Sequence, residues 1–277
     1  MKHFTQPGLL AACLSLTLFQ PSWAQVFGVE LVQNGGAEAG PFSPDGYAPV
    51  TSIPGWSFFT GVNVVRYQTG GEFPVVGSPG PVQRGQQFFS GGNNSPFSTA
   101  SQVIDLTAGS EEIDSGQVVF DFRAWLGGAG SQDDTAQVAA VFNDGDGQSI
   151  GTSTLAGPFA GERGNQTGLL LRTAAGTVPV GTRSITLALT MIRTNGNYNN
   201  GYADNISMVL TAPLPPCDPD VNCDGSANGV DVEIQELAVG GELTDYCQPD
   251  ADFNRDGAVN GTDVEAVELV VGGAPCP

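Results

Sequence analysis

An acidic twelve-residue stretch occurs twice near the C-terminal end of this chain. DVNCDGSANGVD runs from Asp220 to Asp231, and DFNRDGAVNGTD runs from Asp252 to Asp263. When each copy is extended to the Gly-Gly pair that follows it, 14 of 22 residues are identical. An acidic surface turn explains one such stretch poorly, and it explains two with side-chain oxygens at the same positions very poorly. The repeat therefore predicts one local structure, formed twice, that gathers oxygen atoms.

The spacing of the oxygens in each copy is that of an EF-hand calcium loop. Side-chain oxygens stand at positions 1, 3, 5 and 12, position 7 supplies a backbone carbonyl, position 9 binds directly or through water, and glycine at position 6 permits a sharp turn. Calcium prefers six to eight such oxygens. The sequence thus predicts two calcium ions, held by Asp220, Asn222, Asp224, Ser226, Asn228 and Asp231 in the first loop and by Asp252, Asn254, Asp256, Ala258, Asn260 and Asp263 in the second.

Both copies depart from an ordinary EF-hand in two ways. Position 12 is aspartate instead of glutamate, so the loop must close more tightly on its ion. Proline in LPPCDP and CQPDA excludes a helix before either loop, so helix is expected only afterwards, in VEIQELAV and VEAVELVV, each ended by Gly-Gly. The apolar face of the first helix is expected to meet the second helix through Val230, Ile234, Leu237 and Ala238.

Two loop-and-helix units without entering helices resemble the dockerin domain, and the resemblance covers residues 217–277. It implies calcium-dependent docking onto a cohesin-like partner protein. The chain departs from the family at loop positions 10 and 11, which are Gly229-Val230 and Gly261-Thr262 where well-known dockerins often carry Ser-Thr or similar residues. The alternative is a tail stapled by calcium and disulfides that resists proteolysis.

Four cysteines fall within the last 61 residues, at Cys217, Cys223, Cys247 and Cys276. An even number in a short exported segment predicts two disulfides, for which three pairings are possible. A zinc site is the poorer alternative, because the segment has no C-x₂-C spacing. In dockerins the two ends of the domain lie close together, so the resemblance implies Cys217–Cys276 as a clasp and leaves Cys223 for Cys247.

The first 24 residues have the layout of a secretory signal peptide. The only lysine and the only histidine precede an apolar run, and small residues precede a cleavage site expected after Ala24. LAAC at Leu10 to Cys13 offers an alternative, a lipidated cysteine, although the apolar run in front of it is short. No other segment approaches the ~20 apolar residues of a membrane span. The mature protein is expected to be secreted or held at the cell surface.

After this cleavage the chain keeps eight arginines against 29 acidic residues, which gives a formal charge of −21. Such a surface repels nucleic acid and anionic membranes. Without histidine or lysine, the mature chain has no Ser-His-Asp or Cys-His catalysis, no histidine-ligated zinc and no Schiff-base chemistry. Hydrolysis of a glycoside by two carboxylates remains open.

Residues 25–212 are expected to form an all-β domain, separated from the C-terminal module by a proline-rich linker at 213–219. In RSITLALTMI, Ile185, Leu187, Leu189 and Met191 alternate with smaller residues, which is the pattern of a strand with one buried face. Similar strands are expected at 117–126, 135–142 and 203–210, with no convincing helix. Turn-rich segments between them, including a hairpin turn at NDGDG, indicate a sandwich of two antiparallel sheets.

NGGAEAG, IPGW, AWLGGAGSQDD and GYADNISMVL together resemble the galactose-binding-like jelly rolls of secreted bacterial proteins. The resemblance implies a β-sandwich that recognises carbohydrate or a surface. It also implies a structural calcium ion held by Glu38 and Asp204, although Asp204 equally fits a strand-end cap. A sugar site needs an aromatic platform, for which Trp56 and Trp125 are candidates, but both fit better as core residues.

Three functions follow from these observations. The leading hypothesis is an exported, non-catalytic binding protein, with a jelly-roll module for a glycan or a surface and a calcium-dependent dockerin-like module for a partner protein. The second is a carboxylate-dependent glycoside hydrolase or lyase. The third is a calcium-stabilised structural protein of a surface or matrix.

Overall fold

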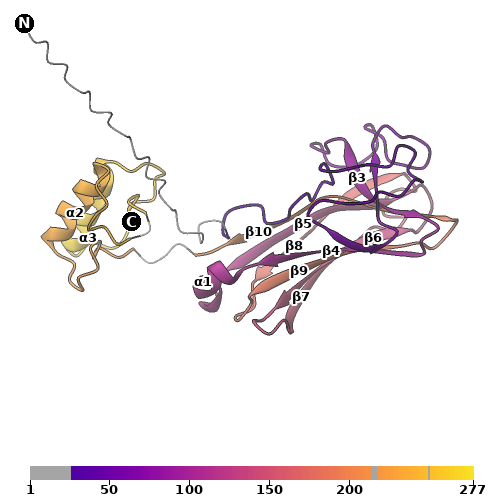
Figure 1. Cartoon of the computed structure of the whole chain (residues 1–277). Helices are drawn as coiled ribbons and strands as arrows, with labels where there is room; N and C mark the ends of the chain where they lie inside the picture. The colour runs from indigo at the N-terminus through magenta and orange to yellow at the C-terminus, as the bar shows by residue number, and fades with distance from the viewer. Residues whose placement is uncertain (1–25, 214–216, 249) are drawn as a thin grey trace, which may run out of the picture. The chain divides into compact units, whose positions relative to one another are not determined.

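The structure is a computed structural model that describes residues 26–213, 217–248 and 250–277. The predicted signal peptide and the alternative lipidation site at Cys13 lie outside the described residues. The chain divides between Pro213 and Leu214 into two compact units, here called the sandwich unit and the C-terminal unit (Figure 1). Among the described residues, every helix is too short or too polar to pass through a bilayer.

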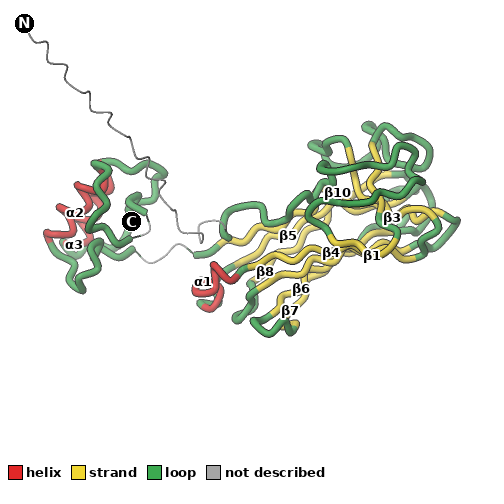
Figure 2. Tube along the Cα trace, viewed as in Figure 1, coloured by secondary structure: helices red, strands yellow, loops and turns green. Residues whose placement is uncertain are grey.

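The sandwich unit consists of two five-stranded sheets in which every neighbouring pair of strands is antiparallel (Figure 2). The first sheet has the strand order β1-β4-β9-β6-β7 and the second has the order β2-β3-β10-β5-β8. The strands are β1 (Ser57–Thr60), β2 (Asn63–Arg66), β3 (Gln87–Asn93), β4 (Phe97–Asp105), β5 (Val119–Gly128), β6 (Thr135–Asn143), β7 (Ser149–Ala156), β8 (Gly168–Thr177), β9 (Ser184–Ile192) and β10 (Tyr198–Thr211).

The order of the strands is that of a jelly roll. β3 lies beside β10, β4 beside β9, β5 beside β8 and β6 beside β7, so that one long antiparallel ribbon is wound into two sheets. β1 and β2 extend the two sheets at their edges. The expected two-sheet antiparallel sandwich is therefore confirmed.

Period-two alternation places the core between the sheets. In β9 the side chains of Ile185, Leu187, Leu189 and Met191 are fully buried, while the residues between them are partly exposed. The strands expected around 117–126, 135–142 and 203–210 are confirmed as β5, β6 and β10, although β10 begins earlier, at Tyr198. NDGDG forms the expected hairpin turn, in which the amide of Asp144 donates to the carbonyl of Gln148.

A second apolar cluster, which the alternation did not predict, lies on the other side of the second sheet. Consecutive residues of β3 point to opposite faces of the sheet. Phe89 belongs to the interior core, and Phe88 belongs to the second cluster. Tyr67 and Phe73, from the segment that joins β2 to β3, pack on this face against Phe88 of β3 and Tyr202 of β10. The segment between β2 and β3 therefore forms a small core of its own on that face.

The sandwich unit also contains a short helical segment that the sequence did not indicate. A 3-10 turn at Thr107–Gly109 leads into α1 (Ser110–Asp114). The carboxylate of Asp105 accepts hydrogen bonds from the backbone amide and the hydroxyl of Thr107, which turns the chain at the end of β4. Five residues are too few to show the apolar periodicity by which a helix is predicted.

The C-terminal unit contains two helices, α2 (Gly229–Val239) and α3 (Gly261–Val271). Both begin three residues before the expected positions, inside the twelve-residue loops, and both end at the expected Gly-Gly pairs, where Gly241 and Gly273 have φ of 91° and 94°. The described residues before each loop are not helical, as expected.

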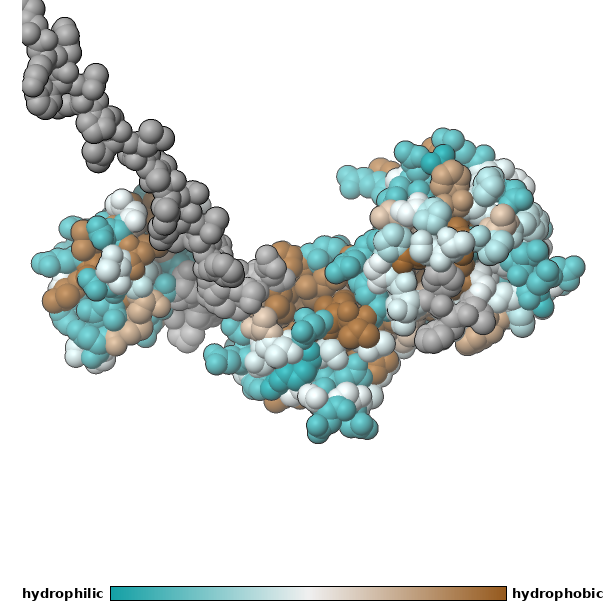
Figure 3. All heavy atoms as spheres, in the orientation of Figure 1, coloured by the Kyte–Doolittle hydropathy of each residue, from teal (hydrophilic) through white to brown (hydrophobic). Residues whose placement is uncertain are grey.

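The buried face of α2 differs from the expected one. Ala238 is buried and Ile234 is partly buried, whereas Val230 and Leu237 are about half exposed, at 48% and 50%. The core of the unit is small and centres on Val221, Phe253 and Val267, so two of these apolar residues remain outside it. On the visible face of this unit, apolar residues stand among hydrophilic ones (Figure 3).

Both disulfides join the expected partners. Cys217 is bonded to Cys276 near the two ends of the unit, and Cys223 is bonded to Cys247. The core cluster of this unit contains only three buried apolar residues, so the stability of the unit depends strongly on the disulfides, which restrict the unfolded chain.

Candidate functional site

The two acidic loops adopt the same backbone conformation. At position 6, Gly225 and Gly257 have φ of 91° and 90°, a region in which a side chain is strained. At position 4, Cys223 and Arg255 have φ of 58° and 61°. Identical turns at identical positions explain why the glycine recurs in both copies and why the residue between the ligands at positions 3 and 5 can vary.

The aspartate at position 1 binds the turn of its own loop. Oδ1 of Asp220 accepts from the amide of Asp224 at 3.1 Å, and Oδ2 accepts from the amide of Gly225 at 2.8 Å. In the second loop the corresponding distances from Asp252 are 3.1 and 2.9 Å. These bonds direct the carboxylate toward the inside of the turn.

The residues at positions 9 and 12 form the start of the following helix. Asn228 is the N-cap of α2 and Asp231 is the third residue of the helix. The two form a capping box, in which the side chain of each accepts a hydrogen bond from the backbone amide of the other. Asp231 is fully buried and accepts from the amides of Asn222 and Asn228 at 3.3 and 2.8 Å. The second loop repeats this arrangement, and the cap explains why each helix begins inside the loop.

The donor set of the loops fits a calcium ion. The aspartates of each loop are not gathered around one point. Among the described residues, no group of three or more acidic, cysteine or histidine side chains is close enough to hold a metal ion. Each aspartate nevertheless has free lone pairs, because a carboxylate offers about four acceptor positions and accepts two hydrogen bonds here, or three at Asp256. Hard oxygen donors with unused lone pairs, around a loop that already turns as required, are what calcium needs.

Glu38 and Asp204 lie close together in the sandwich unit, as the calcium prediction for this pair requires. A side-chain carbon of Glu38 and Oδ1 of Asp204 would lie 3.7 and 3.4 Å from a Cβ placed on Gly36. Oε1 of Glu38 accepts from the amides of Gln86 and Gln87, both at 2.8 Å. Burial raises the pKa of Asp204 to about 8, and the negative charge of Glu38 adds to this effect.

Asp204 does not cap the end of a strand. It lies within β10, fully buried, at an irregularity of the pairing with β5, and the next residue, Asn205, has a left-handed φ of 46°. The NGG segment runs along this irregularity, where a Cβ on Gly35 would lie 1.9 Å from the carbonyl oxygen of Ile206. Glycine at position 35 is therefore required for the close approach that brings Glu38 to Asp204.

Besides the two carboxylates, this region contains an amide oxygen, that of Gln87, which has no hydrogen-bond partner. Oε1 of Gln87 is buried and unpaired, while Nε2 of the same side chain donates to the carbonyl of Glu38 at 3.5 Å. A buried oxygen without a donor is costly, and a cation beside it removes the cost. The carboxylates of Glu38 and Asp204 and the amide oxygen of Gln87 are hard oxygen donors of the kind that calcium binds.

A polar hollow of about 430 Å³ lies at one end of the sandwich unit. Its walls come from loops that are distant in sequence and from the start of β10, and its lining consists of Tyr47, Glu72, Asn93, Asn94, Gln132, Gly196, Asn197, Tyr198 and Asn200. The rings of Tyr47 and Tyr198 meet edge to face, with centroids 5.3 Å apart. Aromatic rings beside amide groups are the combination that a sugar site needs.

Neither tryptophan lines this hollow. Trp56 is buried in the interior core, where its ring meets Phe89 edge to face and its Nε1 donates to the carbonyl of Asn34 at 3.2 Å. Trp125 is half-buried and packs against the second cluster instead of the interior core. The expectation that both serve packing is confirmed for Trp56, and Trp125 serves it on the outer side of its sheet.

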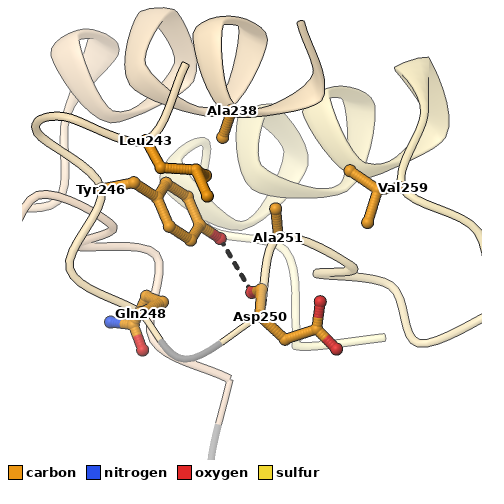
Figure 4. A pocket seen from close by; sticks show the side chains of 7 residues that line it. All are labelled: Ala238, Leu243, Tyr246, Gln248, Asp250, Ala251 and Val259. Carbon is orange, nitrogen blue, oxygen red and sulfur yellow. Dashed lines mark hydrogen bonds between the residues drawn. The ribbon is translucent and has the colours of Figure 1, made fainter. Parts of the chain in front are cut away.

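A second hollow, of about 270 Å³, lies in the C-terminal unit between α2 and the segment that joins the two repeats (Figure 4). The ring of Tyr246 stands in its wall, and its hydroxyl donates to the carbonyl of Asp250 at 3.0 Å. Leu243 and Val259 border it and are 57% and 44% exposed. The hollow is therefore an open apolar depression on a strongly acidic unit.

Sequence reasoning missed the residues of the sandwich hollow. NGNYNNG is one of the turn-rich segments between the expected strands, yet it supplies Tyr198 and Asn200. A tyrosine between asparagines was the available signal, because this run combines an aromatic ring with several amides. Glu72 and Gln132 carried no signal, since their place beside Asn200 depends on the fold.

Comparison with known proteins finds distant structural matches. Neither a protein-family profile nor a curated protein sequence matches the chain. Among solved structures, a family 16 carbohydrate-binding module is 16% identical, with 65% of this chain and 99% of that chain covered and a TM-score of 0.41. A cyclase from Fischerella sp. TAU is 10% identical, with 67% and 99% covered and a TM-score of 0.47.

A tailspike protein of bacteriophage CBA120 is 15% identical, with a TM-score of 0.40 and 66% of this chain covered. The chain spans about a fifth of that structure, because the match covers 21% of it. Similarity at this level does not identify a ligand or a reaction.

Proposed function

We propose that this protein is an exported, non-catalytic binding protein. Its sandwich unit recognises carbohydrate, and its C-terminal unit is a dockerin-like module that binds two calcium ions and docks onto a cohesin-like protein or another surface component. The observation that carries the first part is the hollow lined by tyrosine and amide side chains. Two disulfides in the C-terminal unit favour an oxidising location outside the cell.

The calcium part rests on the match between the two loops. The same φ angles, the same capping boxes and the same bonds from the first aspartate occur in both copies. A pair of purely structural turns has no reason to keep unused carboxylate lone pairs at the same positions. A third ion, held by Glu38, Asp204 and Gln87, would fix the NGG segment against β10.

The docking part rests on the surface of the C-terminal unit. Val230, Leu237 and Leu269 are each close to half exposed or more, although the unit is small and needs apolar residues for its core. The open depression beside Tyr246 can accept an apolar side chain from a partner. The exposed apolar residues at the depression itself are Leu243 and Val259. Exposed apolar groups at a hollow are typical of a docking surface.

A hydrolytic function finds less support in the sandwich hollow. Among the described residues that line it, Glu72 is the one acid, whereas carboxylate-dependent hydrolysis uses two acids on either side of the bond. Glu38 and Asp204 do form an acid pair, but Asp204 is fully buried and bonded to Tyr67. We therefore assign the hollow to binding.

Calorimetric titration of the metal-free mature protein tests the calcium part. We expect two ions to bind to the C-terminal unit, with a gain of helix, and both to be lost in the double variant Asp220→Ala, Asp252→Ala. Asp245→Asn is the matched control, because Asp245 is an exposed aspartate between the repeats and lies outside both loops. Equal calcium binding by the double variant and the control would refute the assignment.

A further inference from the structure

The sandwich hollow has an aromatic wall that is held in place. The ring of Tyr198 is almost buried, it meets Phe73 edge to face at 5.2 Å, and its hydroxyl donates to the carbonyl of Gly46 at 2.8 Å. Tyr47 packs against it, yet 54% of Tyr47 is exposed. Its amide donates to Oδ1 of Asp45 at 2.9 Å, which fixes the turn that presents it. A fixed, exposed ring offers an apolar surface to the C–H face of a sugar.

The polar floor next to this wall presents a donor beside an acceptor. The amide nitrogen of the buried Asn200 donates to Oε2 of Glu72 at 3.1 Å and to Oε1 of Gln132 at 2.8 Å. Gln132 keeps an N–H free, because its amide nitrogen has two donors and a single long contact of 3.5 Å with Glu72. Glu72 keeps free acceptor positions. Adjacent donors and acceptors match the hydroxyl groups of a sugar, which both donate and accept.

The charge of the hollow restricts which sugars it accepts. Glu72 is acidic, and none of the described lining residues is basic. The guanidinium of Arg163 is buried behind the wall, where one nitrogen donates to the carbonyl of Gln132 at 2.6 Å. One nitrogen of the Arg193 guanidinium donates to the carbonyl of Asn197 at 2.8 Å, and Arg193 does not line the hollow. A carboxylate or sulfate on the ligand would lose its water and meet a like charge without a compensating cation.

We infer that this hollow is a sugar site selective for neutral glycans over glycans that carry uronate or sulfate groups, with Tyr47 as the stacking platform and Glu72, Gln132 and Asn200 as the groups that bind hydroxyls. This inference rests on the proposed carbohydrate-binding function and adds the location of the site and the class of its ligand.

Binding of the full mature protein, in calcium, to paired glycans tests it. The probes are immobilised neutral oligosaccharides of hexoses and pentoses, each beside a uronate-containing counterpart such as galactan beside polygalacturonate. We expect binding to neutral members only. Tyr47→Ala should weaken it by about tenfold or more, which corresponds to the loss of one aromatic contact. Phe159→Ala is the matched control, because Phe159 is 57% exposed and lies outside the hollow.

Glu72→Gln separates charge selection from simple contact. The amide keeps an acceptor but removes the negative charge, so affinity for neutral glycans should fall only a few-fold while uronate glycans gain binding. Carbohydrate binding that is unchanged in Tyr47→Ala, or that prefers uronate in the unaltered protein, would overturn the inference and leave the proposed function standing. If the unaltered protein binds none of the glycans, both the inference and the proposed carbohydrate-binding function are refuted. Melting temperatures of the variants show whether they fold.

Discussion

The phenol of Tyr67 donates a 2.6 Å hydrogen bond to the carboxylate of Asp204 inside the sandwich unit. Burial of this carboxyl raises its pKa to about 8, and the nearby Glu38 adds to the shift. The unfolded chain releases the proton near the ordinary pKa of 3.8. The folded state therefore binds one more proton than the unfolded state between these two values, and the free energy of unfolding should fall as the pH rises from about 4 to about 8.

Thermal unfolding in a chelator, followed by a signal of the sandwich unit, measures this dependence. Above pH 8 the slope should disappear, because both states are then ionised. Calcium should raise the melting temperature most at high pH, where it binds the carboxylate without displacing a proton. Asp204→Asn should remove both effects. A calcium response that Asp204→Asn leaves unchanged would show that the ion is bound elsewhere.

Gly225 and Gly257 provide a test of the loop geometry. Replacing either by alanine places a side chain at a φ near 90°, which costs about 1–2 kcal/mol in this region. We expect each variant to weaken one calcium site and to lower the stability of the C-terminal unit. Gly229→Ala is the matched control in the first loop, because Gly229 is the first residue of α2 and a Cβ there meets no atom within 4 Å. If Gly225→Ala and Gly229→Ala behave alike, the turn is not essential for the site.

The disulfide between Cys223 and Cys247 should make the two calcium loops unequal. Cys223 stands between two ligands of the first loop, whereas Arg255 has the same place in the second. The bond restricts the first loop before calcium arrives, so less conformational entropy is lost on binding. The double variant Cys223→Ser, Cys247→Ser should weaken the first site and leave the second nearly unchanged. Calorimetry of this double variant with Asp252→Ala added measures the first site, and with Asp220→Ala added it measures the second. Equal weakening of both sites would contradict the prediction.

Local patterns accounted for the sandwich and for the loops. Ile185, Leu187, Leu189 and Met191 alternate with polar or small residues because their strand has one buried face, so the sequence predicts both strand and face. The twelve-residue repeat predicted the turns because glycine and aspartate are required there by backbone geometry and hydrogen bonding. The positions of these elements follow from neighbouring residues alone.

Features that depend on distant contacts were not predictable in this way. Leu237 has the spacing of a buried helical residue, but the core of the C-terminal unit is too small to cover it. The second cluster arises because the segment after β2 folds over a sheet face that strand alternation would assign to solvent. Glu72, Gln132 and Asn200 meet only because the jelly roll brings two separate loops and the start of β10 to one end.

Asp134 holds the segment that carries Tyr198 and Asn200. It is fully buried, Oδ1 accepts from the amides of Thr194 and Asn195 at 2.6 and 3.1 Å, and Oδ2 accepts from the amide of Asn200 at 2.8 Å. Asp134→Asn turns an N–H₂ group toward backbone donors, which should destabilise the sandwich unit by about 2–3 kcal/mol and weaken neutral-glycan binding.

Asp133→Asn is the matched control for this substitution. Asp133 is exposed, and its Oδ1 accepts a single amide hydrogen bond, from Ala160 at 2.9 Å, so its loss should cost less than about 1 kcal/mol. Chemical denaturation measures both variants, and glycan binding is compared at a temperature where both remain folded. If Asp134→Asn binds neutral glycans as well as Asp133→Asn does, the 194–200 segment is not required to be fixed for recognition. The binding energy would then come from the 45–47 turn and Glu72.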